Sequence, residues 1–372
     1  MKILFSISIV IIVFSLIACQ EDKYPVESLP QSQAKTSVIA ETTYVQQKPD
    51  WDWQGFNMPQ AIVVGNESFI YVADTYNDRI VMLDIAGRVI GYSQYIKQPV
   101  SLAQDKRLQL LVCASFDTLL SGHSAPTTFG ALYRLNLPAV NHTISLATPK
   151  RVFFEPADST RRYTAVATLY DDKYYVARTG PKNALTLIDR DDAILLFSKT
   201  DGLITPVTSG FSPDGTGLLS IHYATSLATS SPLSSTKNVD FIFGQIEVPG
   251  GVIPLLKVQW IQLTIQGQTE GFASKYPSID PNIGITQINK FMQPRGVVVD
   301  PSGNLFVVDS GTDSLYRFNT RGIEQYSFGG HHDKYGRNLV EPYGVAFFAN
   351  TIFIADRGSN RICRFKLSID ME

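Results

Sequence analysis

The side chains best suited to bind a metal or to move a proton are the five histidines of this 372-residue chain. His331 and His332 form the only adjacent pair, and Asp333 is available beside them as a third ligand. Neighbouring side chains of an extended strand point to opposite faces, so this pair converges only if it lies in a loop. No third histidine lies near it in sequence. We therefore expect a solvated loop here, with no metal site and no cofactor.

Covalent catalysis has no clear signal either. No serine lies in the strand–turn–helix elbow that presents an acyl-transfer nucleophile. Two of the three cysteines, Cys113 and Cys363, lie in apolar runs far apart in the chain, as expected for buried free thiols. No cysteine pair has the spacing of a zinc site. We predict no catalytic residue and no disulfide framework.

A second group of residues favours recognition. Long irregular segments at residues 115–129, 224–238, 267–290 and 329–339 contain aromatic side chains, histidines and an arginine among Ser, Thr, Pro and Gly. Aromatic and arginine side chains commonly anchor interfaces. The candidate ligand-binding residues are His123, Tyr223, Phe272, Tyr276, His331, His332, Tyr335 and Arg337.

These segments need a scaffold, and three copies of one pattern indicate what it is. Each copy has a strand that begins with Pro, a second strand that ends in Asp, and a third apolar strand. The copies span residues 59–83, 294–318 and 342–365, and the repeated polar positions are Asp74, Arg79, Asp309, Asp356 and Arg361. One such unit cannot bury its own faces, so the repeat predicts stacked units that share a core.

The repeated residues have structural explanations. The Asp can accept amides of its turn, and the Arg five residues later can pair with it or with the next unit. Ser314 replaces this Arg in the middle copy. A small residue follows each first-strand proline by two positions, where it would let backbones approach; these are Ala61, Ser101, Gly296 and Gly344.

The pattern resembles the NHL repeat, and this resemblance implies an all-β, six-bladed β-propeller. Counting strand-like runs also gives six blades, although five or seven remain open. Blades two to four keep only the regular spacing of strand-like runs and lack the repeated Asp and Arg positions. We expect strands of blade three at residues 163–169, 173–178, 184–189 and 193–197, and strands of blade four at 206–211, 217–223, 239–246 and 252–265.

The last copy lacks a fourth strand, and an open blade would leave an exposed edge at residues 362–367. Residues 36–45 are rich in Thr, Val, Ile and Tyr, which is typical of a strand. We predict that this N-terminal strand is added to the last blade and closes the ring.

In a propeller, the connections between strands alternate between two faces. We call the face with the strand one–two turns the turn face, and the opposite face the loop face. The turns expected on the turn face are short hairpins. All the long segments are therefore expected on the loop face, either as a binding surface or as a cover that binds nothing.

The resemblance also leaves an enzyme open, because look-alikes of this fold include peptide-amidating lyases, lactonases and streptogramin-type lyases. Lactonase-like sites hold a divalent metal at the axis through Glu, Asn and Asp of the inner strands, since a hard cation needs several converging oxygens. The expected inner strands have no carboxylate in their bodies, which argues against such a site here.

The N-terminus points to the cell envelope. Residues 3–18 are uncharged and too short for a membrane span of about 20 residues, but they suit a signal peptide. The run that ends at Cys19 resembles the lipobox of bacterial lipoproteins, in which the Cys carries lipid. Residues 19–35 are polar and indicate a flexible tether to a single propeller domain at residues 36–372. The acidic pair after Cys19 resembles the surface-export signal of Bacteroidetes-like lipoproteins, so an outer-membrane location is expected and its periplasmic or surface side stays open.

With a formal net charge of −2 and 18% charged residues, the chain has no sign of the basic face that nucleic acids require. We expect a membrane-anchored recognition or scaffold propeller that binds a protein, peptide or glycan through its loop face. A lyase or hydrolase acting at that face is the alternative. An accessory subunit of an outer-membrane complex is the second alternative.

Overall fold

The computed structural model describes residues 42–53, 55–183, 189–207, 220–230, 238–248, 253–266, 269–276, 278–330 and 333–371. They belong to the compact unit that spans Thr42–Glu372. The expected signal peptide, Cys19 and the tether lie outside the described residues. Within the described part of the chain, no helix has the length and apolar character needed to cross a membrane.

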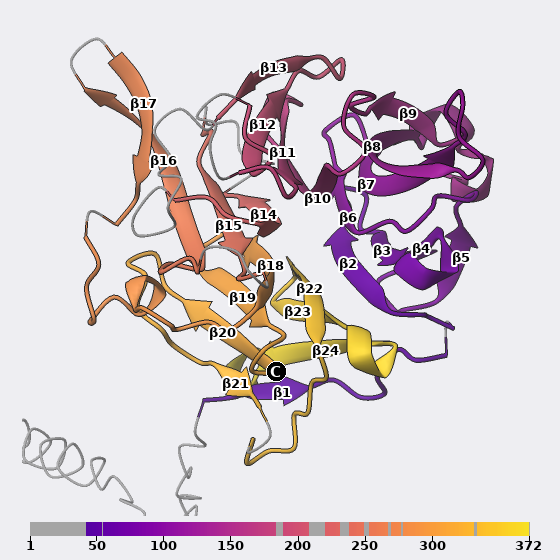
Figure 1. The fold of residues 1–372 in the computed structure, drawn as a ribbon. Coiled ribbons are helices and arrows are strands. Elements are labelled where there is room, and N and C mark those ends of the chain that lie inside the picture. The colour runs from indigo at the N-terminus through magenta and orange to yellow at the C-terminus, as the bar shows by residue number, and fades with distance from the viewer. Residues whose placement is uncertain are drawn as a thin grey trace, which may run out of the picture. The chain divides into compact units, whose positions relative to one another are not determined.

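Six four-stranded antiparallel sheets surround a central axis and form a six-bladed β-propeller (Figure 1). Blade 1 contains β2 (Pro59–Val64), β3 (Ile70–Asp74), β4 (Arg79–Leu83) and β5 (Val89–Tyr92). Blade 2 contains β6 (Ser101–Gln104), β7 (Gln109–Thr118), β8 (Thr127–Asn136) and β9 (Lys150–Phe153). Blade 3 contains β10 (Arg162–Thr168), β11 (Tyr174–Thr179), β12 (Ala193–Phe197) and β13 (Leu203–Pro206).

Blade 4 contains β14 (Ala224–Thr229), β15 (Phe241–Gln245), β16 (Val258–Gln266) and β17 (Thr269–Ser274). Blade 5 contains β18 (Pro294–Val299), β19 (Leu305–Asp309), β20 (Ser314–Phe318) and β21 (Phe328–Gly329). Blade 6 contains β22 (Pro342–Phe348), β23 (Thr351–Asp356), β24 (Arg361–Leu367) and, from the other end of the chain, β1 (Tyr44–Gln46). Short 3₁₀ turns lie at Thr75–Asn77, Pro138–Val140, Ile144–Leu146, Gly284–Thr286, Arg357–Ser359 and Ser368–Asp370.

The core lies between the blades. Strand β3 is buried along its whole length, and its side chains alternate between two neighbours. Tyr71 and Ala73 pack with Leu102 of blade 2, whereas Ile70 and Val72 pack with blade 6. A buried cluster fills each gap between successive blades in this way. The second strands therefore read as continuous apolar runs because they are covered on both faces.

Ring closure by an N-terminal strand is confirmed. Strand β1 pairs antiparallel with β24, and Tyr44 lies opposite Leu367. The closure continues at Trp51, whose backbone exchanges hydrogen bonds of 3.0 and 2.9 Å with Ile362. Trp51 is buried against Phe353, at 5.7 Å between ring centroids. The expected segment at 36–45 contributes its last residues to this strand, and residues 36–41 lie outside the described part.

The inner strands converge as the small residues suggested. A side-chain Cβ at Gly296 would lie 2.3 Å from the carbonyl oxygen of Tyr343, and one at Gly344 would lie 2.8 Å from the amide nitrogen of Ile62. In blades 1, 3, 4, 5 and 6 the inner strand also has a register shift near its first residue. This irregularity starts five of the six inner strands in the same way around the axis.

The strand assignment of blades 3 and 4 was partly wrong. The expected strands at 163–169 and 173–178 match β10 and β11, whereas those at 184–189, 206–211 and 217–223 lie at least in part outside the described residues. Residues 193–197 form the third strand of blade 3, and its fourth strand is β13, part of which was expected to open blade 4. The inner strand of blade 4 is β14, in a segment that was expected to be a loop. Its sequence, Ala-Thr-Ser-Leu-Ala-Thr, lacks the apolar run of a covered strand because hydroxyl groups make part of its contacts. Thr225 Oγ1 donates to the carbonyl of Pro294 at 2.7 Å, and Thr229 Oγ1 donates to that of Thr168 at 2.8 Å.

The prediction that every long segment lies on the loop face was therefore also wrong. Ser230 and the described residues 238–240 follow β14 and precede β15, so they belong to a connection on the turn face. The 267–290 segment is divided, since β17 occupies Thr269–Ser274 and only the part after it crosses the loop face to blade 5. Residues 119–126, Gly330 and residues 333–341 do lie on the loop face.

Candidate functional site

The repeated Asp residues make contacts inside the scaffold. Asp74 is buried, accepts the amide of Asn57 at 2.7 Å and pairs with Arg79 at 2.8 Å. Asp309 accepts the amides of Met292 and Gln293 at 2.7 and 2.6 Å. Each carboxylate fixes the turn that leads into the inner strand of its own blade.

Asp356 of blade 6 repeats the arrangement. It accepts the amide of Val340 at 2.6 Å and receives Arg361 Nε at 2.7 Å. Burial raises the pKa of Asp356 even though these hydrogen bonds favour its charged form. The carboxylate is thus enclosed by scaffold donors and is not presented to a ligand.

A further repeated contact went unnoticed in the sequence. The residue before the third strand has a left-handed backbone, with φ of 51° at Asp78, 51° at Asp313 and 53° at Asn360. Its side chain accepts an amide of the next blade, at 2.7 to 2.8 Å. The donors are Gln98, Glu341 and Met58 respectively. The signal was present as an Asp or Asn before the third strand of every copy, and it links each repeated blade to its successor.

Blade 3 replaces these contacts with a buried charged network. The side chain of Arg178 is 2% exposed and donates to Glu155 Oε1 at 2.7 Å and to Asp189 Oδ1 at 2.9 Å. Arg161 donates to Asp191 Oδ1 at 2.8 Å and to Glu155 Oε1 at 2.7 Å. Burial opposes the charge of Asp189, but hydrogen bonds from both arginines hold its pKa below the ordinary value.

Beside this network lies a histidine–carboxylate pair. His222 Nδ1 is 3.2 Å from Asp192 Oδ2, and Thr179 Oγ1 donates to Asp192 Oδ1 at 2.7 Å. A carboxylate that orients an imidazole is the usual arrangement of a general base. Both side chains are buried, and both lie on loop-face connections.

The predicted ligand-binding residues do not form one cluster. His123 is exposed in the loop between β7 and β8, and Tyr335 is exposed between β21 and β22. Tyr223 is half-buried before β14, and Phe272 belongs to β17, where its ring lies 5.6 Å from that of Phe241. Tyr276 is buried between blades 4 and 5. His331 and His332 lie outside the described residues.

Arg337 holds the ring closed. It pairs with Asp333 at 2.7 Å and donates to the Tyr44 carbonyl at 3.0 Å, on the closing strand. Burial opposes the charge of Asp333, but hydrogen bonds from Arg337 and from backbone amides outweigh it and lower the pKa of Asp333 to about 2. Arg337 also lies 4.8 Å from the ring of Tyr335, and this is the one contact among the described candidates that brings two of them together.

A group of more strongly exposed large side chains lies on other connections of the loop face. Three aromatic residues, Trp53, Tyr76 and Tyr95, and Leu119 are 55%, 54%, 70% and 63% exposed, and we call these four residues the aromatic rim. They lie on four neighbouring connections of blades 1 and 2. Hydrogen bonds link these connections in order: Asn77 to Gly55, Gln98 to Asp78 and Ser115 to Lys97.

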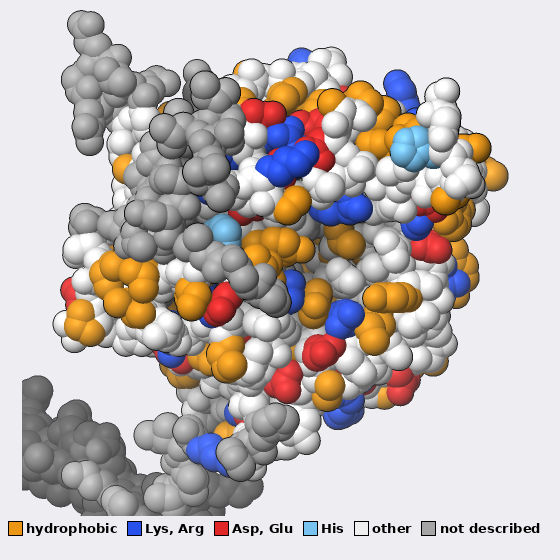
Figure 2. Space-filling model, viewed as in Figure 1, with side chains coloured by type: hydrophobic (Ala, Val, Ile, Leu, Met, Phe, Trp, Pro, Cys, Tyr) orange, Lys and Arg blue, Asp and Glu red, His pale blue; other side chains and the backbone are white. Residues whose placement is uncertain are grey.

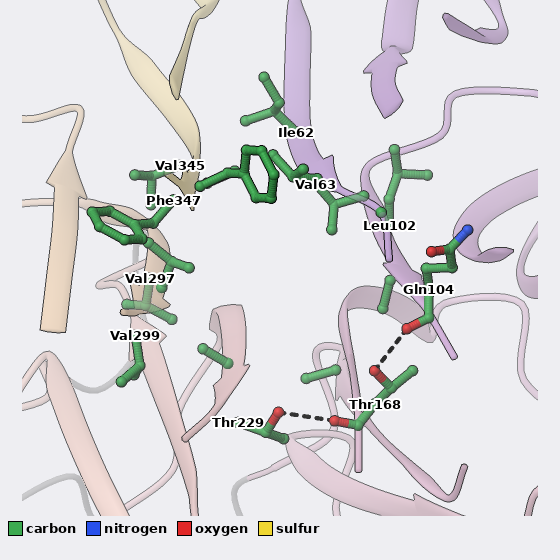
Figure 3. Close-up of a pocket in the computed structure, with 18 of the residues that line it drawn as sticks. Ile62, Val63, Leu102, Gln104, Thr168, Thr229, Val297, Val299, Val345 and Phe347 are labelled. Atoms are coloured by element: carbon green, nitrogen blue, oxygen red, sulfur yellow. Dashed lines mark hydrogen bonds between the residues drawn. The ribbon is translucent and has the colours of Figure 1, made fainter. Parts of the chain in front are cut away.

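A cavity of about 770 Å³ lies at the other end of the axis, where the inner strands reach the turn face. All six inner strands line it, and ten of the lining residues are labelled in Figure 3. Hydrophobic side chains are also visible in a hollow near the centre of the propeller (Figure 2). This cavity thus lies on the axis, at the end of the inner strands that faces the turns.

Six equivalent positions, one from each inner strand, form a ring within this cavity. In the repeated blades this position lies five residues after the proline that begins the inner strand. Blades 1, 5 and 6 place apolar side chains there, Val64, Val299 and Phe347. Blades 2, 3 and 4 place polar ones, Gln104, Thr168 and Thr229. We call these six residues the axial ring; one arc of it is apolar and the opposite arc is polar.

The lining residues offer no free acid or base. Asp300 is the ionisable residue among them, and its carboxylate accepts the amides of Ser302 and Asn304 at 2.9 and 2.8 Å. The inner strands β2, β6, β10, β14, β18 and β22 contain no Asp or Glu. In the described part of the chain, no group of three or more His, Cys, Asp or Glu is placed to hold a metal.

No protein-family model and no curated protein matches the chain. Solved structures do match it. The PQQ-bound aldose sugar dehydrogenase of Streptomyces coelicolor is 12% identical, with a TM-score of 0.56, covering 88% of this chain and 99% of that one. A gluconolactonase of Xanthomonas campestris is 11% identical, with a TM-score of 0.54, covering 88% and 90%.

A protein of unknown function from Bacteroides thetaiotaomicron is 13% identical, with a TM-score of 0.54, covering 88% of this chain and 76% of that one. At such low identity these likenesses show the fold alone. The NHL repeat stays a resemblance carried by three blades. The chain is a six-bladed β-propeller whose structural neighbours include gluconolactonases and a sugar dehydrogenase.

Proposed function

We propose that this chain is a recognition propeller that binds a protein or peptide through the loop face of blades 1 and 2. The aromatic rim carries the proposal, because four large apolar side chains are exposed on adjoining connections that the scaffold holds in place. Aromatic anchors on a rigid base lose little conformational entropy on binding, and exposed apolar patches commonly mark interaction sites.

We further propose that lipid on Cys19 anchors the propeller in the cell envelope, at the outer membrane. The run before Cys19 and the polar segment after it support this part. Replacing Cys19 by Ala should release the protein from the membrane fraction, and unchanged retention would contradict the anchor without touching the rim.

The rim is tested by pull-down from native membranes in mild detergent, with a C-terminal tag and mass spectrometry. The variant combines Trp53→Ser, Tyr76→Ser and Tyr95→Ser. Tyr326→Ser is the matched control, because Tyr326 is an exposed aromatic residue on the turn-face side of blade 5. Loss of one partner from the rim variant alone is expected. Equal recovery from both would overturn the rim as the binding surface.

Other outcomes of the same experiment identify the alternatives. Recovery of a whole outer-membrane complex would make the chain an accessory subunit. Retention of a polysaccharide in place of a protein would make the partner a glycan.

An enzyme is the second candidate, and the Asp192–His222 pair is the observation that favours it. A lyase or hydrolase could use an oriented imidazole as its general base. The test is a screen of the purified protein against lactones and esters, with His222→Asn beside the wild type. Turnover that disappears in His222→Asn would establish this candidate, and equal rates in both proteins would remove it.

A further inference from the structure

The axial cavity is independent of the loop face and has a chemistry of its own. Its size, about 770 Å³, falls within the range of about 300 to 1,000 Å³ typical of small-molecule sites. Its wall is mostly aliphatic, with Phe347 and Phe348 on one side. Such a wall favours a compact apolar body.

The polar arc of the axial ring has its hydrogen-bond donors largely in use. Thr168 Oγ1 donates to the carbonyl of Gln104 at 3.0 Å, and Thr229 Oγ1 donates to that of Thr168 at 2.8 Å (Figure 3). A hydroxyl that donates once can still accept through its lone pairs. The arc therefore offers two hydroxyl acceptors side by side.

Gln104 is fixed in the same arc. Its Oε1 accepts the amide of Asn66 at 2.7 Å, and its Nε2 donates to Glu67 Oε1 at 2.8 Å. Tyr71 also donates to Glu67 Oε1, at 2.6 Å, so this carboxylate is anchored from two sides. The orientation of the Gln104 amide is thus set before any ligand arrives.

The charge balance excludes ionic ligands. Among the described residues that line the cavity there is no Lys, Arg or His, and Asp300 is engaged by its own turn. An ion placed against this wall would lose its hydration without a partner of opposite charge, which is costly. A neutral ligand has no such penalty.

We propose that the axial cavity binds a small uncharged amphiphile, an aliphatic or alicyclic alcohol. Its hydroxyl donates to Thr168 or Thr229, and its apolar body lies against Val64, Val299 and Phe347. The site opens at the turn end of the inner strands, so it can be occupied while a partner is bound on the loop face.

The test uses the full chain with Cys19→Ala, which removes the proposed lipid acceptor and the need for detergent. The probe is N-phenyl-1-naphthylamine, an uncharged dye that fluoresces in apolar surroundings. Competitors are 1-decanol and decanoate, which share a chain length and differ in charge. We expect 1-decanol to displace the dye and decanoate to fail; displacement by both at equal concentration would overturn the neutral-ligand assignment.

Two variants locate the site. Val299→Trp should fill the cavity and abolish dye binding, whereas Val340→Trp, at an exposed loop-face position, should leave it unchanged. Thr168→Val combined with Thr229→Val keeps the side-chain shape and removes the hydroxyls, so the affinity for 1-decanol should fall about tenfold.

Unchanged dye binding by a folded Val299→Trp protein would place the dye elsewhere and overturn the proposal. Should Val299→Trp fail to fold, the threonine pair decides. An unaltered 1-decanol affinity in that pair would also overturn it.

Discussion

Blades 1, 5 and 6 and blades 2, 3 and 4 build the same architecture with different side chains. In the first set, a buried Asp at the end of the second strand holds the turn before the inner strand. In blade 4 the corresponding residue is Gln245, whose Oε1 accepts the amide of His222 at 2.7 Å. An amide side chain can thus replace the carboxylate at this position, and in blade 3 Arg178 occupies the equivalent position.

The same division recurs on the axis, where the axial ring is apolar in the first set and polar in the second. The repeated blades all use a buried Asp to hold the turn before the inner strand. The divergent blades keep the geometry and change the chemistry, and they contain both the Asp192–His222 pair and the polar arc. Divergence from the repeat therefore changes the side-chain chemistry of a blade while its strand geometry is kept.

The largest expected effect concerns blade 6, the repeated blade that draws its fourth strand from the other chain end. Deleting residues 42–51 removes β1 and Trp51 and reopens the ring. We expect the melting temperature to fall by about 10 °C or more, since several kcal/mol of buried contact are lost. Deleting residues 20–35 is the control. Equal melting of the two deletions would mean that the ring closes in another way.

The next largest difference is expected between an arginine of a divergent blade and an arginine of a repeated blade. Arg178 of blade 3 is 2% exposed, whereas the Arg79 side chain of blade 1 is 26% exposed. Arg178→Ala should destabilise the protein by about 3–5 kcal/mol because it leaves the buried backbone carbonyls of Arg190 and Asp191 without this donor. Arg79→Ala should cost about 1–2 kcal/mol, because Asp74 keeps the Asn57 amide and the Asn77 side chain as donors. Urea unfolding measures both, and similar losses would show that the blade 3 network carries no special weight.

Substitutions at the end of the second strand test whether Asp and Gln stabilise the preceding turn equally. Asp309→Ala should cost about 2–4 kcal/mol because it removes the acceptor of three backbone amides, those of Met292, Gln293 and Gly311. Gln245→Ala should cost a similar amount, since it releases the amide of His222 and the carbonyls of Ser220 and Leu256. Thermal unfolding of the two variants provides the comparison. A loss confined to Asp309→Ala would show that the blades are not equivalent there.

The smallest expected effect is a pH dependence at the ring closure. The folded pKa of Asp333 is lowered to about 2, from an ordinary 3.8. The ionised carboxylate therefore adds stability above the unfolded pKa, and this contribution, about 2 kcal/mol, is lost as pH falls from about 4 to 2. Urea unfolding across this range should show the loss in the wild type and a flatter profile in Asp333→Asn. Parallel profiles would contradict the assignment.

The sequence was sufficient for the fold where local signals and burial agree. The Pro-initiated strands and the Asp-ended strands marked blades 1, 5 and 6, and the missing fourth strand of blade 6 pointed to closure by the N-terminus. It was insufficient for β14, because a strand beside the axis can use Thr hydroxyls where a covered strand uses aliphatic side chains. The boundaries of blade 4 that the apolar runs predict therefore differ by one strand from the observed boundaries.

The site was less predictable for a related reason. Tyr276 and Arg337 have the residue types of interface anchors, yet the first fills a gap between blades and the second holds the closing strand. Composition alone does not separate an anchor from a core residue. The axial ring was invisible because its positions become equivalent only when the register shift of each inner strand is known.

The pairing of β1 with β24 has a mechanical consequence. Under the proposed anchoring through Cys19, tension on the anchor would enter the propeller at Tyr44–Gln46, the strand that also holds the ring together. A force large enough to separate β1 from β24 would open blade 6 before it disturbed the other blades. The backbone hydrogen bonds between Trp51 and Ile362 would then be the next contacts to resist the force. The same short strand would then both receive the force from the membrane anchor and keep the ring of blades closed.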